Sequence, residues 1–413
     1  MATDMRATFF PSSLPNITKR FTALFGPNVE VESPLGLSGM GARISGIDLC
    51  ERLAPSQVEL LLDTLSHCRL ITIAGQDLER FSLATFECFA NHWGAPVAHP
   101  SNFLRDGKPA QQDGASDGLI EIRPYSDRKV AAADSTLPGQ VFCLPHDSPA
   151  VLVATNLLGD GDRDKSRLKD GGTWHTDIEY EPLPIYVSMF LVHHVPIGRD
   201  PSSGHWVDPP IAEGPEPYFP GSDSDLMELR KELPLNGETA YADTASAFVA
   251  LSQEEQTKLE AVRVRRRLNE KDNGFLAPLV RTDPRSGLKS LHSPVWASRP
   301  GVRPPIEVEG MTPEASRAFL DRIEKHVLQP QFRYDHQHTP GDVTIWNNYM
   351  SLHNSPPIKT GIDKTEDARL MYRLSCKGEP SLTLPRDDEI SWIDEHIPGR
   401  YRSPASIVGK YQP

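Results

Sequence analysis

The chain contains 413 residues, of which 56 are acidic and 43 are basic, and its formal net charge is −13. An acidic balance without a long basic run argues against a nucleic-acid groove or an anionic membrane surface as the main partner. The length alone permits two or three domains, but one large β fold covered by helices fits it equally well.

The five cysteines are scattered along the chain without metal-type spacing. An odd, dispersed set is typical of reduced thiols in a cytosolic protein. Residues 1–30 lack the apolar run of a signal peptide, and no later run is long enough to span a membrane. We therefore expect a soluble, cytoplasmic protein.

The first hundred or so residues predict an irregular arm followed by short strands and helices. Residues 1–30 contain three prolines and no sustained period, so an irregular N-terminal arm is expected. Apolar periodicity and turn residues then predict strands within 29–49 and over 69–74, and helices over 55–65 and 82–93.

Two stretches interrupt the regular patterns that follow. Residues 101–147 are rich in Asp, Gly, Pro, Ser and Gln, and residues 196–235 are rich in proline with several glycines. Strands are predicted over 151–155, 186–195, 332–338, 343–346 and 369–376, and helices over 252–262 and 312–327. The run 263–267 has four arginines in five positions, and a solvated helix end or strand edge is the expected setting.

The tripeptide His175-Thr176-Asp177 is a candidate metal site. Residues two apart on an extended strand face the same side, so the imidazole and the carboxylate can reach one ion. Alone, such a pair is more often a surface histidine. A third ligand at His353, in the downstream segment 341–353, would complete two histidines and one carboxylate, the facial triad that leaves open positions on non-haem Fe(II).

Arginines follow this second cluster. A guanidinium can hold the distal carboxylate of a dicarboxylate with two parallel hydrogen bonds, which makes Arg369 a candidate co-substrate ligand. Arg369 and Arg373 are four positions apart on the predicted strand, so both side chains should face the same side. His336 and His338 also have ligand spacing, but no third ligand lies near them in the sequence, and no metal is expected there.

Ordered motifs in the chain resemble those of the TauD/TfdA family of Fe(II)/2-oxoglutarate-dependent dioxygenases, the taurine dioxygenase and 2,4-dichlorophenoxyacetate dioxygenase family. In order, they are Ala42–Leu49, Trp93–Pro100, Trp174–Asp177, Gly237–Asp243 and Trp346–Arg373. Ordered matches over about residues 40 to 380 are far more specific than a single motif.

The resemblance implies a mixed, mainly β fold, in which a double-stranded β-helix or jelly-roll core carries flanking helices. We expect one dioxygenase domain at 31–380 with insertions at about 101–147 and 196–235. The arm at 1–30 would precede it and a C-terminal extension at 381–413 would follow. A rigid β scaffold suits three ligands that come from separated segments.

The resemblance also implies a cofactor and its ligands. Fe(2+) is expected on His175, Asp177 and His353, with 2-oxoglutarate and O2 as co-substrates and ascorbate as a supporting reductant. The distal carboxylate of 2-oxoglutarate is expected on Arg369 and Thr239, because a threonine at this motif position makes that contact in the family.

His99 and Arg373 match positions that contact the acidic group of the substrate in the family. They imply a small anionic substrate, a sulfonate or a carboxylate, that is hydroxylated at an unactivated C–H bond with release of succinate and CO2. A loop role for His99 explains its position equally well, and Arg373 could instead help to position 2-oxoglutarate.

Other functions stay open. The same chemistry could hydroxylate, desaturate or close a ring on a secondary metabolite or a purine, and a non-catalytic binding protein could share the fold. The expected partner is a small-molecule substrate, without nucleic acid or membrane. The sequence leaves homo-oligomerisation open, because no interface is visible in it as a stripe or repeat.

Overall fold

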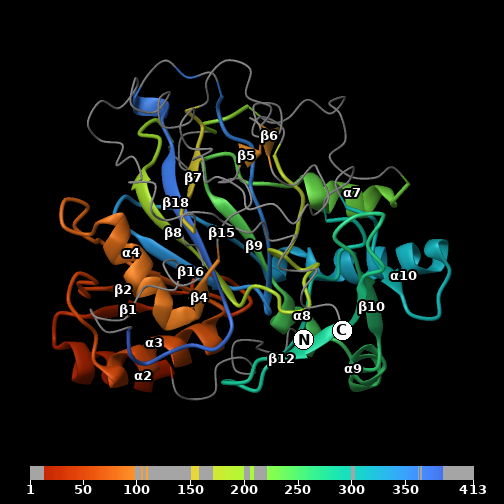
Figure 1. Cartoon of the computed structure of the whole chain (residues 1–413), viewed down its shortest axis with the longest axis horizontal. Helices are drawn as coiled ribbons and strands as arrows, with labels where there is room; N and C mark the ends of the chain where they lie inside the picture. Colours follow the sequence, from red (N-terminus) through yellow and green to blue (C-terminus); the bar gives the residue numbers. More distant parts are fainter. Residues whose placement is uncertain are drawn as a thin grey trace.

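The computed structural model describes residues 14–97, 104–105, 108–109, 150–157, 171–199, 205–208, 221–298, 303–360, 362 and 365–384 (Figure 1). Its α-helices are α2 (Leu14–Phe25), α3 (Pro55–Cys68), α4 (Leu83–Ala90), α7 (Ser224–Lys231), α8 (Thr244–Val249), α9 (Gln253–Glu260) and α10 (Pro313–Val327). Short 3-10 helices are η1 (Asn91–Trp93), η4 (Pro330–Phe332) and η5 (Thr365–Asp367).

The largest sheet has eight strands. Its order is β1 (Glu30–Glu32), β2 (Ala42–Ser45), β3 (Leu70–Ile73), β16 (Val343–Asn347), β8 (Val187–His194), β18 (Leu370–Lys377) and β4 (Ala95–Pro96), with β7 (Leu152–Thr155) also paired to β18. β2 and β3 are parallel, whereas β8 is antiparallel to both β16 and β18. These central strands are buried along most of their length, which explains their nearly continuous apolar sequences.

A second, antiparallel sheet faces the first. It contains β15 (Arg333–His336), β9 (Thr239–Asp243) and β17 (Ser351–Asn354) in that order. Buried side chains of both sheets meet in one cluster, which includes Phe190, Tyr241 and Trp346. The rings of Tyr241 and Trp346 lie edge to face with centroids 5.7 Å apart. The predicted mainly β architecture is therefore confirmed, and the two sheets enclose the space into which the site residues point.

Helices α2, α3 and α4 cover the other face of the large sheet, on the side of the molecule that holds β1 and β2 (Figure 1). The prediction of an irregular arm over residues 1–30 is wrong for residues 14–25, which form α2. Ile17 and Phe21, one helical turn apart, are both buried in this core. Pro15 is compatible with the helix because the first turn leaves its N–H groups unpaired in any case.

A second core lies under α8, α9 and α10. It also includes the sheet β11 (Phe275–Pro278), β10 (Arg263–Arg266) and β14 (Glu307–Val308), next to the hairpin β12 (Val280–Thr282) and β13 (Lys289–Leu291). The expectation of a solvated arginine run holds for Arg263 but is wrong for Arg266. β10 is the middle strand, so alternate residues face inward, and the buried Arg266 donates to the His292 carbonyl at 2.7 Å.

The other predicted elements that lie within the described residues are present. Thr312 and Ser252 cap α10 and α9, since their hydroxyl oxygens accept from the backbone N–H three residues on. The stretch at 196–235 contains α7, and the stretch at 101–147 contains the strand pair β5 (Leu104–Arg105) and β6 (Lys108–Pro109). The remainder of 101–147 and residues 385–413 of the predicted extension at 381–413 lie outside the described residues.

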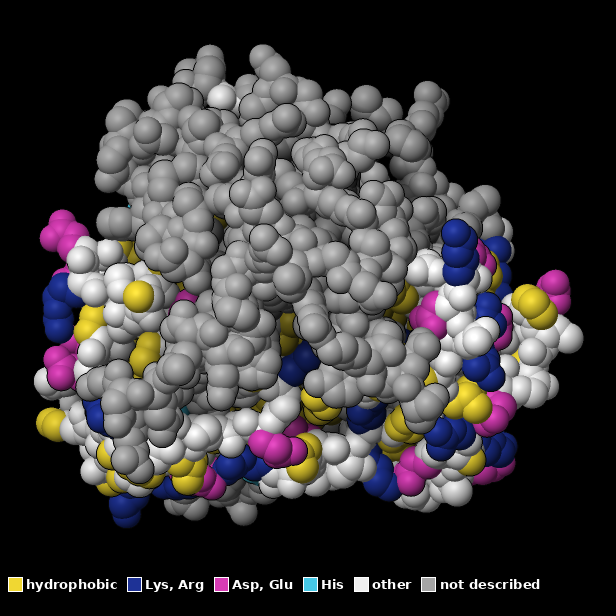
Figure 2. All heavy atoms as spheres, viewed as in Figure 1, with side chains coloured by type: hydrophobic (Ala, Val, Ile, Leu, Met, Phe, Trp, Pro, Cys, Tyr) yellow, Lys and Arg dark blue, Asp and Glu magenta, His cyan; other side chains and the backbone are white. Residues whose placement is uncertain are grey.

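The described surface carries both signs of charge. On the face in Figure 2, cationic and anionic side chains are interspersed rather than gathered into one stripe. Among the helices that the structure describes, none combines the length and the apolar character needed to cross a bilayer.

Candidate active site

Three side chains predicted to bind iron converge between the two sheets. One ligand atom from each of His175, Asp177 and His353 lies within 4.8 Å of the others. Asp177 Oδ1 lies 3.6 Å from His175 Nε2 and 3.5 Å from His353 Nε2. One oxygen and two ring nitrogens thus face a common point, as required of ligands to one ion.

Backbone pairing brings the two histidines together. His175 does not belong to a regular strand, but it forms an isolated antiparallel bridge with His353 of β17. Their N–H groups donate to each other's carbonyls at 3.0 and 2.9 Å, and the ring centroids are 4.3 Å apart. Asp177, two residues on from His175, lies in the turn that follows, so the His-x-Asp spacing still places both side chains on one side.

Hydrogen bonding fixes the orientation of the first ligand. His175 Nδ1 lies 2.8 Å from the Thr173 carbonyl oxygen, which can only accept. Nδ1 must therefore carry the proton, and Nε2 presents its lone pair to the centre of the site. The structure thus holds His175 in the tautomer that a metal ligand needs.

Asp177 is 3% exposed, and its two oxygens have different neighbours. Oδ1 faces the histidines, whereas Oδ2 accepts a hydrogen bond from Ser188 Oγ at 2.7 Å and an ion pair from Arg373 Nη2. Although burial opposes ionisation, the charge of Arg373 and the nearby histidines hold the Asp177 pKa well below its usual range. Asp177 is therefore an ionised carboxylate with one oxygen directed at the two histidines, and this donor set fits a divalent metal.

Arg369, the first predicted co-substrate ligand, directly precedes β18. Its backbone is fixed, because its N–H donates to Asn156 Oδ1 at 2.8 Å and its carbonyl accepts from Thr155 Oγ1 at 2.7 Å. The side chain is 6% exposed, and its guanidinium forms no ion pair with any described residue. Burial and the nearby charge of Arg199 lower the Arg369 pKa to about 10. A buried guanidinium without a counter-ion is a fitting partner for a ligand carboxylate.

Thr239, the other predicted co-substrate ligand, begins β9 and is buried. Its hydroxyl lies 2.8 Å from His338 Nε2. Burial lowers the His338 pKa well below its usual value, and the charges of His336 and Arg369 lower it further, so Arg369 lies in the surroundings of the same imidazole. The structure thereby brings Arg369 and Thr239 to one region. His336 and His338 are both buried there.

The structure describes one of the two predicted substrate ligands, Arg373, but not the other, His99. Arg373 lies in β18 and points between the sheets, but its guanidinium contacts the carboxylate of Asp177. His99 lies outside the described residues. The sequence reasoning missed Ser188 and Arg199. No pattern singles out Ser188, whose hydroxyl is placed by the register of β8 against β18, whereas Arg199 belongs to a stretch treated only as an insertion.

Comparison with known proteins identifies the family. The model of the family described as "Taurine catabolism dioxygenase TauD, TfdA family" matches residues 32–375. Pentalenolactone F synthase of Streptomyces arenae is 22% identical over 56% of this chain and 70% of its own length. Alpha-ketoglutarate-dependent 2,4-dichlorophenoxyacetate dioxygenase of Cupriavidus pinatubonensis is 30% identical over 29% of this chain and 45% of its own length.

A solved structure extends the likeness to the fold. AAD-2 in complex with Mn(II) and N-oxalylglycine superposes with a TM-score of 0.53 over 86% of this chain and 100% of that chain, at 16% identity. Because the family model spans most of the sequence, the resemblance stated from the motifs is confirmed. The chain belongs to the TauD, TfdA family and is a 2-oxoglutarate-dependent dioxygenase.

Proposed function

We propose that the chain hydroxylates an unactivated C–H bond of a small, anionic substrate, a sulfonate or a carboxylate. In the balanced reaction, 2-oxoglutarate, O2 and R–H give succinate, CO2 and R–OH. A ferrous ion bound at the site would supply the redox chemistry with O2. The buried convergence of His175, Asp177 and His353 is the observation that carries the proposal.

The protein's own side chains would prepare the site for this reaction. His175, Asp177 and His353 would hold the metal, and the guanidinium of Arg369, which has no ion pair among the described residues, would bind the distal carboxylate of 2-oxoglutarate beside Thr239. The apolar rings of Tyr241 and Trp346 would limit water around the reacting groups. The complex of AAD-2 with Mn(II) and N-oxalylglycine supports a divalent metal together with an oxalyl ligand on this fold. The paired sheets would form the predicted jelly-roll core.

Arg373 supports an anionic substrate. Its side chain is 16% exposed, so the guanidinium is partly open while it contacts Asp177. The sulfonate or carboxylate group of a substrate could bind the same guanidinium, and His99 would be its second contact. The relatives (S)-phenoxypropionate/alpha-ketoglutarate-dioxygenase and 2,4-dichlorophenoxyacetate dioxygenase are named for carboxylic acids, which agrees with this choice.

A secondary-metabolite substrate is the second candidate. The match to pentalenolactone F synthase favours it, and on such a substrate the same site could hydroxylate, desaturate or close a ring. A purine substrate or a non-catalytic role has less support. All the predicted metal ligands and Arg369 are present in the chain, which argues against a protein that has lost its chemistry.

Succinate release tests the proposal. Purified protein is supplied with Fe(II), ascorbate, 2-oxoglutarate and O2 and with one member at a time of a panel of taurine, other sulfonates, aryloxyacetates, other carboxylates and xanthine. Stimulation by one anionic class is the expected result. Slow succinate release that no member stimulates would favour the secondary-metabolite alternative, and no Fe(II)-dependent succinate at all would refute the proposed reaction.

A further inference from the structure

Arg199 lies beside the segment that carries Arg369. It follows β8, in the stretch at 196–235 that the family motifs do not include. The N–H of Ile197 donates to the Glu366 carbonyl at 2.8 Å, so the chain before Arg199 runs against the chain before Arg369. Two segments far apart in sequence thus bring two arginines into the same region.

Both arginines act on His338. Arg199 Nη2 donates to the His338 carbonyl, while the imidazole of His338 is bonded to Thr239. Burial is the main cause that lowers the His338 pKa, and the charges of Arg369 and Arg199 lower it further. After burial, the Arg199 charge is the main cause that lowers the Arg369 pKa. The two guanidiniums are therefore close enough to repel each other, next to the predicted co-substrate ligands.

Within the described structure, no acidic side chain forms an ion pair with either guanidinium. Arg199 Nη1 and Arg369 Nε are buried and have no hydrogen-bond acceptor. Two acids, Glu238 and Asp342, act on Arg199 through space, and Glu238 also acts on Arg369. Asp342 accepts from both terminal nitrogens of Arg43 at 2.7 and 3.0 Å, and Glu238 accepts from the N–H of Asn236 at 2.7 Å. Glu238 can offset only one of the two positive charges, so a buried Arg369 beside a half-buried Arg199 leaves an excess positive charge that an anion between them would balance.

We propose that Arg199 is a second guanidinium for the distal carboxylate of the 2-oxo acid, so that Arg199 and Arg369 hold it from two sides. This inference rests on the proposed use of 2-oxoglutarate. Its consequence is specificity, because a two-arginine site favours a 2-oxo acid with a distal carboxylate over one without it. Removing one charge-assisted donor pair should matter only for the ligand that has this carboxylate.

Equilibrium binding to the Mn(II)-loaded protein tests the role of Arg199 without turnover. The dissociation constants of 2-oxoglutarate and of 2-oxobutyrate, which lacks the distal carboxylate, are measured by calorimetry. In Arg199→Gln the constant for 2-oxoglutarate should rise at least tenfold, while that for 2-oxobutyrate should change less than twofold. Arg199→Lys keeps the positive charge but loses the two parallel N–H donors of the guanidinium, so its dissociation constant for 2-oxoglutarate should be intermediate.

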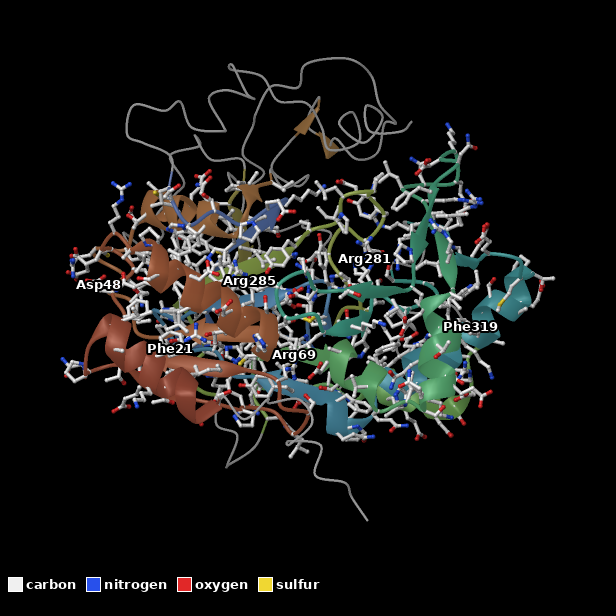
Figure 3. The ribbon with its side chains drawn as sticks, turned by 90° about the horizontal axis from the view of Figure 1, so that it is seen from below. Phe21, Asp48, Arg69, Arg281, Arg285 and Phe319 are labelled. Atoms are coloured by element: carbon white, nitrogen blue, oxygen red, sulfur yellow. The ribbon has the colours of Figure 1, made fainter. Side chains whose placement is uncertain are left out.

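Arg285→Gln is the matched control, because Arg285 is also half-buried and pairs with Glu59 and Asp63 of α3 (Figure 3). It should change neither constant. If Arg199 only supports the His338 carbonyl, Arg199→Gln should weaken the binding of both 2-oxo acids equally, and that result would overturn the inference. Unchanged binding of 2-oxoglutarate in Arg199→Gln would overturn it as well. If the wild-type protein does not bind 2-oxoglutarate, the proposed function itself fails.

Discussion

The two carboxylate oxygens of Asp177 have different partners in this site. Its Oδ1 faces the two histidines, and its Oδ2 is held by Ser188 and Arg373. A carboxylate held in this way can offer one oxygen to a metal without rotating, because the other is already bonded. Residues behind a ligand therefore affect metal affinity although they do not touch the ion.

Ser188→Ala should weaken metal binding about tenfold, because one of the two partners that orient Asp177 is lost. Titration of the metal-free protein with Mn(II) measures the effect. Ser316→Ala is the control, since Ser316 is also buried but its hydroxyl accepts from the N–H of Val308 in β14, which contributes no residue to the site. Equal affinities in Ser188→Ala and the wild type would show that Ser188 does not position the ligand.

Parts of the site could be predicted from the sequence and others could not. His175, Asp177, His353 and Arg369 stand in short sequence motifs, and the structure brings the first three of them together. The contact of Arg373 with Asp177 follows from tertiary packing, and spacing along one strand cannot reveal it. The roles of the ligands stay predictions until metal binding is measured.

At the scale of elements, amphipathic segments with clear caps were predicted well. α10 has Thr312 as its N-cap and Pro313 in its first turn, and both signals are local. α2 was missed because prolines on both sides of it indicated an irregular arm, whereas its stability comes from Phe21 packing in the core beneath it. The burial of Arg266 could not be predicted for a related reason, since burial of a charged residue depends on neighbours distant in sequence.

One buried ion pair joins elements of the two cores. Arg69, at the end of α3, donates to Asp243 Oδ2 at 2.6 Å, and both side chains are 0% exposed. Asp243 ends β9 and caps α8, since its Oδ1 accepts from Ser246 N–H at 2.9 Å. Figure 3 shows Arg69 between Phe21 at one end of the molecule and Phe319 at the other.

Asp243→Ala should lower the free energy of unfolding by about 3–5 kcal/mol, because it leaves Arg69 buried without its counter-ion. Urea denaturation measures the loss. Glu254→Ala breaks an exposed ion pair with Lys258 on the same helix and should change the free energy of unfolding little. Similar small losses in both variants would mean that water or another group compensates Arg69.

At the scale of the whole molecule, the order of strands could not be read from the sequence. β16 lies between β3 and β8, although more than a hundred residues separate it from each. Such pairings depend on which apolar faces fit together, and local patterns do not specify them. The family resemblance supplied the architecture, and the division into one domain with an arm and an extension stays a prediction.

Stability should depend on pH through buried neutral histidines. Burial, with the charges of Arg43 and Arg199, lowers the His336 pKa to about 3 from 6.5. Below pH 6.5 the unfolded chain takes up a proton that the folded protein does not, so folding loses stability as the pH falls towards 3. One such group contributes at most about 1.4 kcal/mol per pH unit in this window.

His336→Gln should reduce this acid sensitivity. Urea unfolding of the variant and the wild type at several pH values between 7 and 4.5 measures it, and the slope is compared because Gln can change stability at every pH. The free energy of unfolding of the variant should fall less steeply below pH 6.5. Parallel pH profiles would show that His336 is not held neutral in the folded protein.

Anaerobic titration with Fe(II) in the presence of 2-oxoglutarate tests the central claim most directly, because a 2-oxo acid chelated to Fe(II) produces a charge-transfer absorption band. The band should saturate at one Fe(II) per chain in the wild type. His175→Ala, Asp177→Ala and His353→Ala should each require at least tenfold more Fe(II). No band in the wild type, or wild-type behaviour in all the variants, would contradict a metal centre at these residues.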